Sequence, residues 1–414
     1  MFRKGKILLL VISVGIVLYG ASAVFFGKDA YKELAVFMEV IQKIRDEYVE
    51  VPDMGKVQEG AMRGLIGALD PYCSFLTREQ YEELQKRGED ATAGAGMVLS
   101  TRADVVYVVS VESDGPAAKA GVRPGDYLVS VDGKEVEDMS ILEVDHLLRG
   151  APGTVVKLQI FRDSQTKPQD MELTLREPAE ALVASEMLDG GVGYLKVESL
   201  SPASVEQAKV KLKTLVAAGA SKLLLDLRNC ADGEVGAGAD VANFFLEKGV
   251  VYYSRDRQGA KLDEVEASPD KFLTDLPLAV LINGSTAGAA EIVAGALKDH
   301  DRASLVGKKS FGVGSAQKTM KLKSGAVLIL STAKYCTPSG KVIQDETARK
   351  AGIEPDFDSP DTETRQDLAV ESYYDYDEDE TRYQMIKGKV EKIQLDKALE
   401  VLGGGAAEGL RQAA

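Results

Sequence analysis

Residues 280–291, VLINGSTAGAAE, constrain the fold of this chain more than any other segment. The pattern predicts an apolar strand that runs directly into a helix rich in small residues. A strand-to-helix turn of this kind is a place where a catalytic nucleophile commonly lies. In this chain that position is Gly288, which has no side chain. The segment therefore predicts the framework of a nucleophile site without the nucleophile.

Strands and helices alternate around this segment, between residues 190 and 360. Alternation of this kind favours a partly parallel sheet covered by helices, so we expect a mixed α/β unit. The predicted strands are 192–197, 222–227, 250–253 and 278–282, and the predicted helices are 201–218, 240–248 and 286–299.

A second unit is predicted over residues 91–178, where short strands alternate with glycine-containing turns. Asp132-Gly133 is a hairpin-type turn, and Gly115–Asp126 indicates a short helix followed by a turn. Helical spacing of apolar residues at 30–50 and 56–68, and a helix start after Thr77, predict a helical region before this unit. The strands of the second unit are expected at 105–111, 127–131 and 155–161, with a helix at 140–149.

These motifs resemble those of the tail-specific, or carboxyl-terminal processing, proteases. Residues 280–291 resemble the family's NGxSASASE run, and Gly307–Gln317 (GKKSFGVGSAQ) resembles FGKGxxQ. The glycine pattern from Gly115 onward resembles a circularly permuted PDZ domain. Further similarity lies in the DPYSxYL-like segment 69–76 and in the TPSGRxIQ- and GIxPD-like segments 337–344 and 352–356.

The resemblance covers about residues 33–402 and implies an α/β (α+β) fold. We expect a PDZ domain joined to a mixed α/β protease core of the ClpP/crotonase-like type, with an N-terminal helical segment. The expected parts are a signal peptide or membrane anchor (1–27), a helical region (28–90), the PDZ domain (91–178), the protease-like core (179–360) and an acidic tail with a terminal helix (361–414).

The resemblance also assigns catalytic positions. The family's nucleophilic serine falls on Gly288, its base lysine on Val313, and the glutamine that orients the lysine on Gln317. One oxyanion donor would be the amide of Ala289. The other would come from a DLRxNPGG-like loop that here ends in Asp232-Gly233, where an acidic side chain opposes a developing oxyanion. A Ser-Lys protease needs a hydroxyl and an uncharged amine, and both are absent from these positions.

Substitute catalysis is the alternative to a lost reaction. The candidate nucleophiles are Ser285, Thr286, Ser315 and Cys230, with Lys308, Lys309 and Lys318 as nearby amines. Each of these residues also fits ordinary loop chemistry. The sequence thus leaves open an active serine-type endopeptidase with an unrecognised nucleophile.

The PDZ resemblance implies a peptide site. The loop Gly94-Ala95-Gly96-Met97 would receive a terminal carboxylate on its amides, because glycines let bare N–H groups converge on an anion. The next strand would accept the peptide by β-augmentation. The groove wall would come from the helix at Ile141–Leu148, including Val144 and Leu148. A PDZ-like module that merely packs against the core is the alternative.

Composition limits partners and location. The net charge of −15, without a basic cluster beyond the N-terminus, argues against nucleic-acid binding. Two histidines and three scattered cysteines offer neither a metal site nor a disulfide framework, and we expect no cofactor. Arg3, Lys4 and Lys6 precede an uncharged run, Ile7–Phe26, which predicts export through a cleaved signal or a membrane anchor.

Three functions remain open on the sequence. The first is an extracytoplasmic, non-catalytic relative of these proteases in the periplasm or cell envelope, which binds polypeptide C-termini and regulates an active paralogue or forms a homo-oligomer. The second is the substitute-nucleophile peptidase, and the third is a structural envelope protein with an idle groove. We favour the first, because the departures from the family pattern concentrate on the reacting groups.

Overall fold

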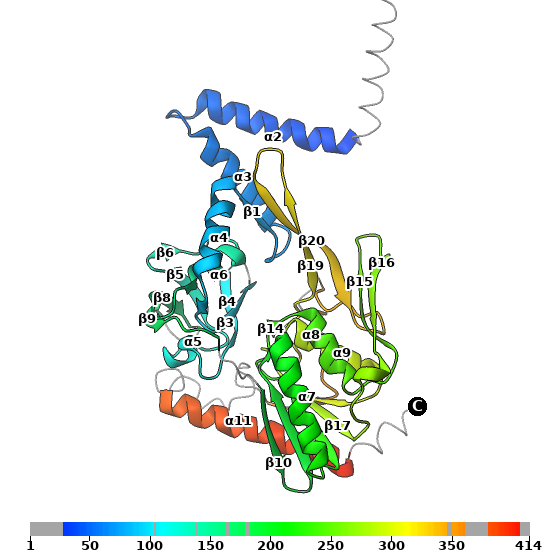
Figure 1. Ribbon diagram of the computed structural model, residues 1–414. Coiled ribbons are helices and arrows are strands. Elements are labelled where there is room, and N and C mark those ends of the chain that lie inside the picture. The colour runs from blue at the N-terminus through cyan, green and yellow to red at the C-terminus, as the bar shows by residue number, and fades with distance from the viewer. Residues whose placement is uncertain are drawn as a thin grey trace, which may run out of the picture. The chain divides into compact units, whose positions relative to one another are not determined.

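The computed structural model describes residues 28–102, 105–137, 139–162, 166–178, 183–345, 350–360 and 380–405 (Figure 1). The chain divides into two compact units, Met1–Leu65 and Ile66–Ala414. The predicted signal segment (1–27) and most of the predicted acidic tail (361–379) lie outside the described residues. Among the helices that are described, none is both long and apolar enough to cross a bilayer.

Helices make up the described part of the first unit. Helix α2 spans Lys28–Glu47, and α3 spans Met54–Gly67, ending just inside the second unit. Asp53 starts α3 because its carboxylate accepts hydrogen bonds from the amides of Gly55 and Lys56, at 3.0 and 3.3 Å. These helices agree with those predicted at 30–50 and 56–68.

A short strand and a capped helix lead into the PDZ domain. Strand β1 is Ser74–Leu76, and helix α4 is Arg78–Asp90. The Thr77 hydroxyl accepts a hydrogen bond from the Gln80 amide, and the Gln80 side chain accepts one from the Thr77 amide. The predicted helix start after Thr77 is therefore present, with Gln80 completing a capping box.

The PDZ domain is an antiparallel sheet in the order β3-β4-β5-β8-β9, with β6 paired to β5 and β3 at one edge. Its interior is a continuous apolar cluster that includes Val108, Leu128, Val144 and Leu158. The elements are β2 (Ala93–Gly94), β3 (Met97–Arg102), β4 (Val105–Val111), α5 (Pro116–Lys119), β5 (Tyr127–Val131), β6 (Lys134–Glu135), α6 (Ile141–Leu147), β7 (Arg149–Gly150), β8 (Val155–Phe161) and β9 (Gln169–Thr174).

Helix α6 depends on its N-terminal cap. The Ser140 hydroxyl accepts a hydrogen bond from the Glu143 amide, and the Glu143 carboxylate accepts one from the Ser140 amide. Ser140→Ala is therefore expected to lower the free energy of unfolding by about 1 kcal/mol. Urea unfolding followed by circular dichroism measures the change. Ser140→Thr retains a capping hydroxyl and serves as the control, so an equal loss in both variants would contradict this role of the cap.

The core domain is built on a second, mostly parallel sheet in the order β10-β11-β13-β17-β18-β21, in which β10–β11 is the antiparallel pair. The predicted partly parallel sheet is confirmed. Its strands are β10 (Val183–Leu188), β11 (Val192–Val197), β13 (Lys222–Asp226), β17 (Leu278–Ile282), β18 (Ser304–Gly307) and β21 (Phe357–Asp358).

Successive side chains point to opposite sides of this sheet, and helices cover both faces. Leu223 and Leu225 pack with helices α7 (Pro202–Ala217), α8 (Val235–Asn243) and α9 (Ala289–Asp299). Leu224 packs on the other face with Ala398 of helix α11 (Glu380–Glu400) and Val401 of the following π-helical turn, η3 (Val401–Gly405). The result is a helix–sheet–helix arrangement, visible in Figure 1.

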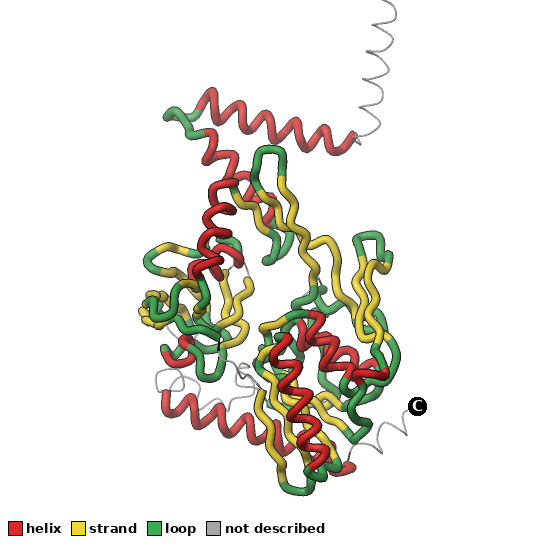
Figure 2. The backbone as a smooth tube through the Cα atoms, viewed as in Figure 1, coloured by secondary structure: helices red, strands yellow, loops and turns green. Residues whose placement is uncertain are grey.

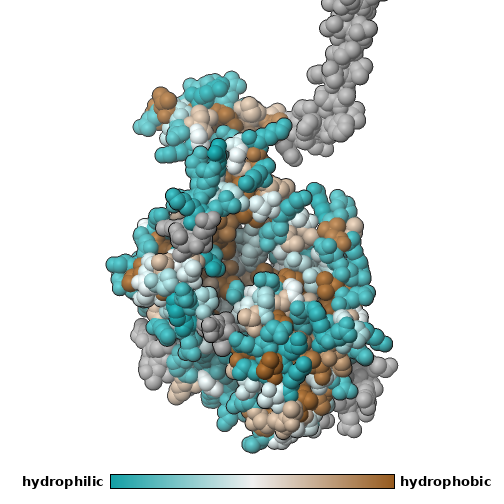
Figure 3. Space-filling view, in the orientation of Figure 1, coloured by the Kyte–Doolittle hydropathy of each residue, from teal (hydrophilic) through white to brown (hydrophobic). Residues whose placement is uncertain are grey.

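Hydrophilic residues predominate on the face of the molecule drawn in Figure 3.

A third sheet, in the order β1-β20-β15-β16 with β19 paired to β20, carries a long hairpin (Figure 2). Its strands beyond β1 are β15 (Val250–Arg255), β16 (Lys261–Glu266), β19 (Ser315–Lys321) and β20 (Val327–Cys336). The short parallel pair β12 (Ser199–Leu200) and β14 (Asp232–Gly233), and the 3-10 turn η1 (Pro269–Lys271), complete the core.

The helix predicted at 240–248 was misplaced. Helix α8 begins earlier, at Val235, and ends at Asn243. Its first turns contain Gly236 and Gly238, which lower helix propensity. A methyl group on Gly238 would lie 2.5 Å from the carbonyl oxygen of Ala289, so the glycine allows α8 to cross the start of α9. The packing of α8 against α9 thus requires a glycine at 238, and the low helix propensity of glycine hid the start of α8 in the sequence.

Candidate functional site

The strand-to-helix turn at Gly288 defines the centre of the site. Strand β17 is buried along its whole length, and the chain turns into α9 at Gly288 with φ 60° and ψ −117°. Residues other than glycine rarely adopt these backbone angles. Strained strand-to-helix turns of this kind carry the nucleophile in other enzymes. The helix starts at Ala289, later than the predicted 286, because Gly288 is not helical.

The space at Gly288 would accept a side chain. A methyl group built there would have the carbonyl oxygen of Ala231 as its nearest neighbour, at 3.8 Å, which is an ordinary van der Waals contact. The position therefore has room for a side chain, although any residue with a Cβ would be strained at this positive φ. Glycine satisfies the turn but supplies no reacting atom.

A buried carboxylate, that of Glu291, connects Gly288 with Val313. Its Oε2 accepts hydrogen bonds from the amides of Gly288 (2.9 Å) and Val313 (2.8 Å). Its Oε1 accepts from the Gly312 amide (2.8 Å) and the Ser310 hydroxyl (2.5 Å). The structure thus brings the two positions matched to the family's serine and lysine to one oxygen atom.

Burial raises the pKa of Glu291 to about 7, although its four hydrogen-bond donors act in the opposite direction. Glu291 was not among the predicted site residues. Its place on the third residue of α9, where a side chain can reach back to the helix start, was the available signal.

The side chain of Val313 lies in an apolar contact layer between the PDZ domain and the core. The layer is formed by Tyr107 and Val109 of β4 together with Ala287 and Phe311 of the core, and the rings of Tyr107 and Phe311 stack with centroids 6.0 Å apart. A valine suits these surroundings. It offers no group that could accept a proton from residue 288.

Gln317 lies on β19 and is exposed. Its side-chain amide donates to the Ser315 hydroxyl at 2.9 Å. The predicted orienting role of this glutamine has no lysine to act on in this chain, because Val313 occupies that position.

The predicted oxyanion donors are unequal. The amide of Ala289 opens α9 and makes no hydrogen bond within the described part of the chain, so it is available as a donor. Gly233, at φ 140°, is packed against Leu200, whose carbonyl oxygen lies 2.4 Å from the place of a methyl group on the glycine. Asp232 is exposed and accepts a hydrogen bond from Ser199. The loop therefore keeps its glycine and adds a carboxylate beside it.

The substitute nucleophiles are held in structural roles. Ser285 and Thr286 are fully buried, and their hydroxyls donate to the carbonyl oxygens of Val109 (2.5 Å) and Leu227 (2.8 Å). Cys230 is also fully buried, and burial strongly raises the pKa of its thiol, which disfavours the reactive thiolate.

Two of the remaining candidates, Ser315 and Lys308, also have partners. Lys309 lies 3.9 Å from the carboxylate of Glu354, and Lys318 is exposed on β19. The Ser315 hydroxyl accepts hydrogen bonds from Gln317 and Ser331. Lys308 forms an ion pair with Asp358 at 3.0 Å, which favours its charged form over the neutral amine that a base requires.

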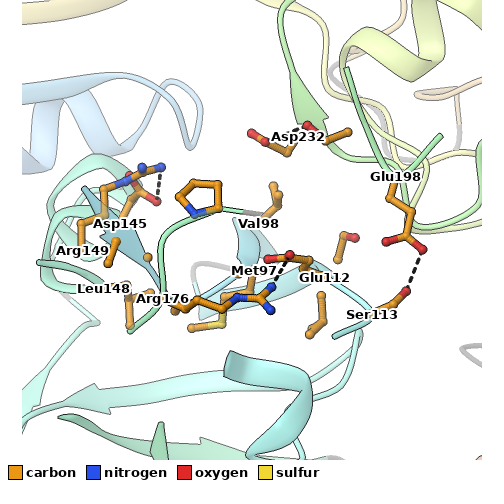
Figure 4. A pocket seen from close by; sticks show the side chains of 18 of the residues that line it. Met97, Val98, Glu112, Ser113, Asp145, Leu148, Arg149, Arg176, Glu198 and Asp232 are labelled. Carbon is orange, nitrogen blue, oxygen red and sulfur yellow. Dashed lines mark hydrogen bonds and ion pairs between the residues drawn. The ribbon is translucent and has the colours of Figure 1, made fainter. Parts of the chain in front are cut away.

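A pocket of about 160 Å³ lies at the end of the PDZ domain (Figure 4). The whole predicted loop Gly94–Met97 and Leu148 line it, together with six charged residues. The charged residues are Glu112, Asp145, Arg149, Arg176, Glu198 and Asp232. The predicted Ile141 and Val144 are not in this lining: Val144 is fully buried in the PDZ interior and Ile141 packs against it. Glu112 and Arg176 were not predicted, since neither belongs to a local motif.

Comparisons with known proteins agree with the structure of both the core domain and the PDZ domain. The sequence profile described as Peptidase family S41 matches residues 191–359, and the PDZ domain profile matches residues 107–162. The solved structure titled photosystem II D1 C-terminal processing protease matches with a TM-score of 0.65 at 26% identity, covering 84% of this chain and 98% of that one. Fold and site therefore define a PDZ-containing S41 serine peptidase framework.

Two curated relatives carry the assignment further. The carboxy-terminal-processing protease of Bartonella bacilliformis is 33% identical over 334 residues, covering 80% of this chain and 76% of that protein. The carboxyl-terminal-processing protease of Synechocystis sp. is 32% identical over 321 residues, covering 76% and 74%. The chain belongs to the carboxyl-terminal processing protease family, which confirms the resemblance seen in the sequence.

Proposed function

We propose that this chain is a non-catalytic member of its family that binds polypeptide C-termini. The observation that carries the proposal is the meeting of residues 288 and 313 at Glu291. Two backbone amides bind one carboxylate oxygen there, while a glycine and a valine stand at the positions matched to the family's serine and lysine. Losing one partner of such a pair typically lowers the rate by about 10⁴-fold or more.

The neighbouring hydroxyls and thiol do not replace the missing groups. Ser285 and Thr286 would each have to give up a hydrogen bond to a buried carbonyl, and Cys230 would have to ionise in an apolar interior. These costs argue against the substitute-nucleophile alternative.

The PDZ pocket supports recognition of a chain end. Strand β3 is an edge strand of its sheet, so its outer side is available for β-augmentation by an extended peptide. The loop before it contains glycine at positive φ, Gly96 (72°), next to an apolar lining that includes Ala95, Met97 and Leu148.

Export and partners follow as parts of the same proposal. The basic N-terminus and the apolar run Ile7–Phe26 favour a location in the periplasm or cell envelope. A binder there would protect chain ends or form mixed oligomers with an active paralogue or with its own copies.

The experiment compares two fluorescein-labelled peptides that end in three alanines, one with a free carboxylate and one amidated. With the purified full chain we expect the free form to bind at least about tenfold more tightly, because the amide loses the charge that the loop recognises. Mass spectrometry of the same mixtures should show no cleavage. Equal binding of both forms would contradict C-terminal recognition, and dose-dependent cleavage that survives further purification would contradict loss of catalysis.

A further inference from the structure

The carboxylate of Glu112 lies inside the pocket, against the glycine loop. Glu112 follows β4, and its amide donates to the Gly96 carbonyl at 2.8 Å. A methyl group on Gly96 would lie 2.8 Å from Oε2 of Glu112, and one on Gly115 would lie 2.9 Å from its Cβ. The two glycines therefore leave room for the Glu112 side chain to fold back over the loop.

Arg176 holds this carboxylate in place. Its guanidinium donates to Oε1 of Glu112 at 2.5 Å (Figure 4). The Arg176 backbone is itself bound to the loop, because it exchanges hydrogen bonds with Gly94 at 2.9 and 3.3 Å. The Nε atom of Arg176 is buried and has no hydrogen-bond partner among the described residues, so the guanidinium is not saturated.

The loop amides divide into two pairs. Those of Gly94 and Ala95 donate to the carbonyls of Arg176 and Leu148, so they are not available to a ligand. The amide of Gly96 makes no hydrogen bond within the described part of the chain. The Met97 amide points away from β4, because Glu112 bonds to Gly96 and hydrogen-bonded pairs alternate along an antiparallel ladder. The donors left for an anion therefore adjoin the Glu112 carboxylate.

We propose that Glu112 occupies the subsite of the terminal carboxylate and thereby sets the affinity of the PDZ pocket for chain ends. This inference rests on the proposed function. Two carboxylates cannot share one small set of donors without strong repulsion. A polypeptide C-terminus then binds when the Glu112 side chain moves off the loop or takes up a proton.

The release of the Glu112 carboxylate from the glycine loop is expected to depend on pH. Burial raises the pKa of Glu112, and the Glu198 and Asp114 carboxylates add to this, while Arg176 lowers it. A peptide carboxylate has an ordinary pKa of about 3.5 and stays ionised where Glu112 begins to protonate. Lowering the pH from 7 to 5 should therefore strengthen binding. The other charged groups that line the pocket are Asp145, Arg149 and Asp232.

The test measures binding of the free and amidated peptides to the full chain and to its Glu112→Ala variant at pH 7 and pH 5. We expect Glu112→Ala to bind the free form about tenfold more tightly at pH 7 and to lose most of the pH dependence. The amidated form should respond little. Glu112→Gln, which keeps the shape without the charge, should shift binding in the same direction. Asp145→Asn, which changes a carboxylate of the same pocket that pairs with Arg149, is the matched control.

The outcomes separate the two proposals. Free-form binding that is unchanged or weaker in both Glu112 variants overturns the role of Glu112 while leaving C-terminal recognition intact. An equal gain from Asp145→Asn also overturns it, because the effect would then be one of general charge. A gain in free-form binding that is larger in both Glu112 variants than in Asp145→Asn supports it. Absence of free-form binding in every variant at both pH values overturns the proposed function and this inference with it.

Discussion

The double variant Gly288→Ser, Val313→Lys is expected to cleave unfolded peptides, with a rate at least about 10²-fold above that of the unmodified chain. Either substitution alone should leave the rate at background, since the hydroxyl and the amine act as a unit. The reason for expecting a gain is that the framework is intact. The amides of residues 288 and 313 already bind the same oxygen of Glu291.

The local surroundings suit both new side chains. Residue 288 has room for a Cβ, and its backbone already holds the conformation that a nucleophile turn requires. Serine there carries a backbone strain of about 1–3 kcal/mol, which the surrounding buried strand and helix can hold. Lysine at 313 would enter a layer lined by Tyr107, Val109 and Phe311, where desolvation lowers the pKa of its amine toward the neutral form of a base.

Controls for this experiment follow from the same geometry. Gly288→Ala with Val313→Lys introduces the Cβ and the amine without the hydroxyl, so it should remain inactive. The readout is mass spectrometry of peptides that end in small apolar residues. A folded double variant that cuts no faster than this control would show that more than the two reacting groups has been lost. Asp232→Gly would then be the next change, because its carboxylate lies in the loop that matches the family's oxyanion loop.

The sequence predicted those features that local patterns encode. Strand β17 follows from an uninterrupted apolar run, and the alternation of strands and helices around it predicts the parallel sheet. The predicted helix start at 286, by contrast, ran past the turn at Gly288. The capping residues Thr77 and Ser140 mark two helix starts within a few residues. In each case neighbours in sequence decide the structure, so no knowledge of distant contacts is needed.

Features that depend on distant contacts were missed or misplaced. Glu291 gains its role from amides more than twenty residues away, at Gly312 and Val313. Glu112 and Arg176 meet across the PDZ domain, and no motif joins them. Val144 has the apolar character of a groove residue, yet the structure places it in the domain interior. The spacing of apolar residues shows that one face of a helix is buried. It does not show whether that face packs in the domain interior or lines a groove.

Glu291 is expected to be the largest single contributor to the stability of the site. Glu291→Ala would leave three amides and the Ser310 hydroxyl without their acceptor in a buried place. Each unsatisfied group costs about 1–3 kcal/mol, so we expect a loss of about 3 kcal/mol or more in the free energy of unfolding. Urea unfolding followed by circular dichroism measures it, with the exposed Glu186→Gln on β10 as the control.

The pH dependence gives a sharper test of the same residue. The pKa of Glu291 is raised from 4.5 to about 7 in the folded chain, so the folded state holds this proton more tightly than the unfolded state. Its stabilising effect is complete below about pH 4.5 and is lost as the pH rises through about 7, by about 3 kcal/mol in total. Glu291→Gln, which cannot titrate, should remove this slope between pH 5 and 8, whereas Glu186→Gln should keep it. A slope that is equal in both variants would show that Glu291 is ionised throughout, held so by its four donors.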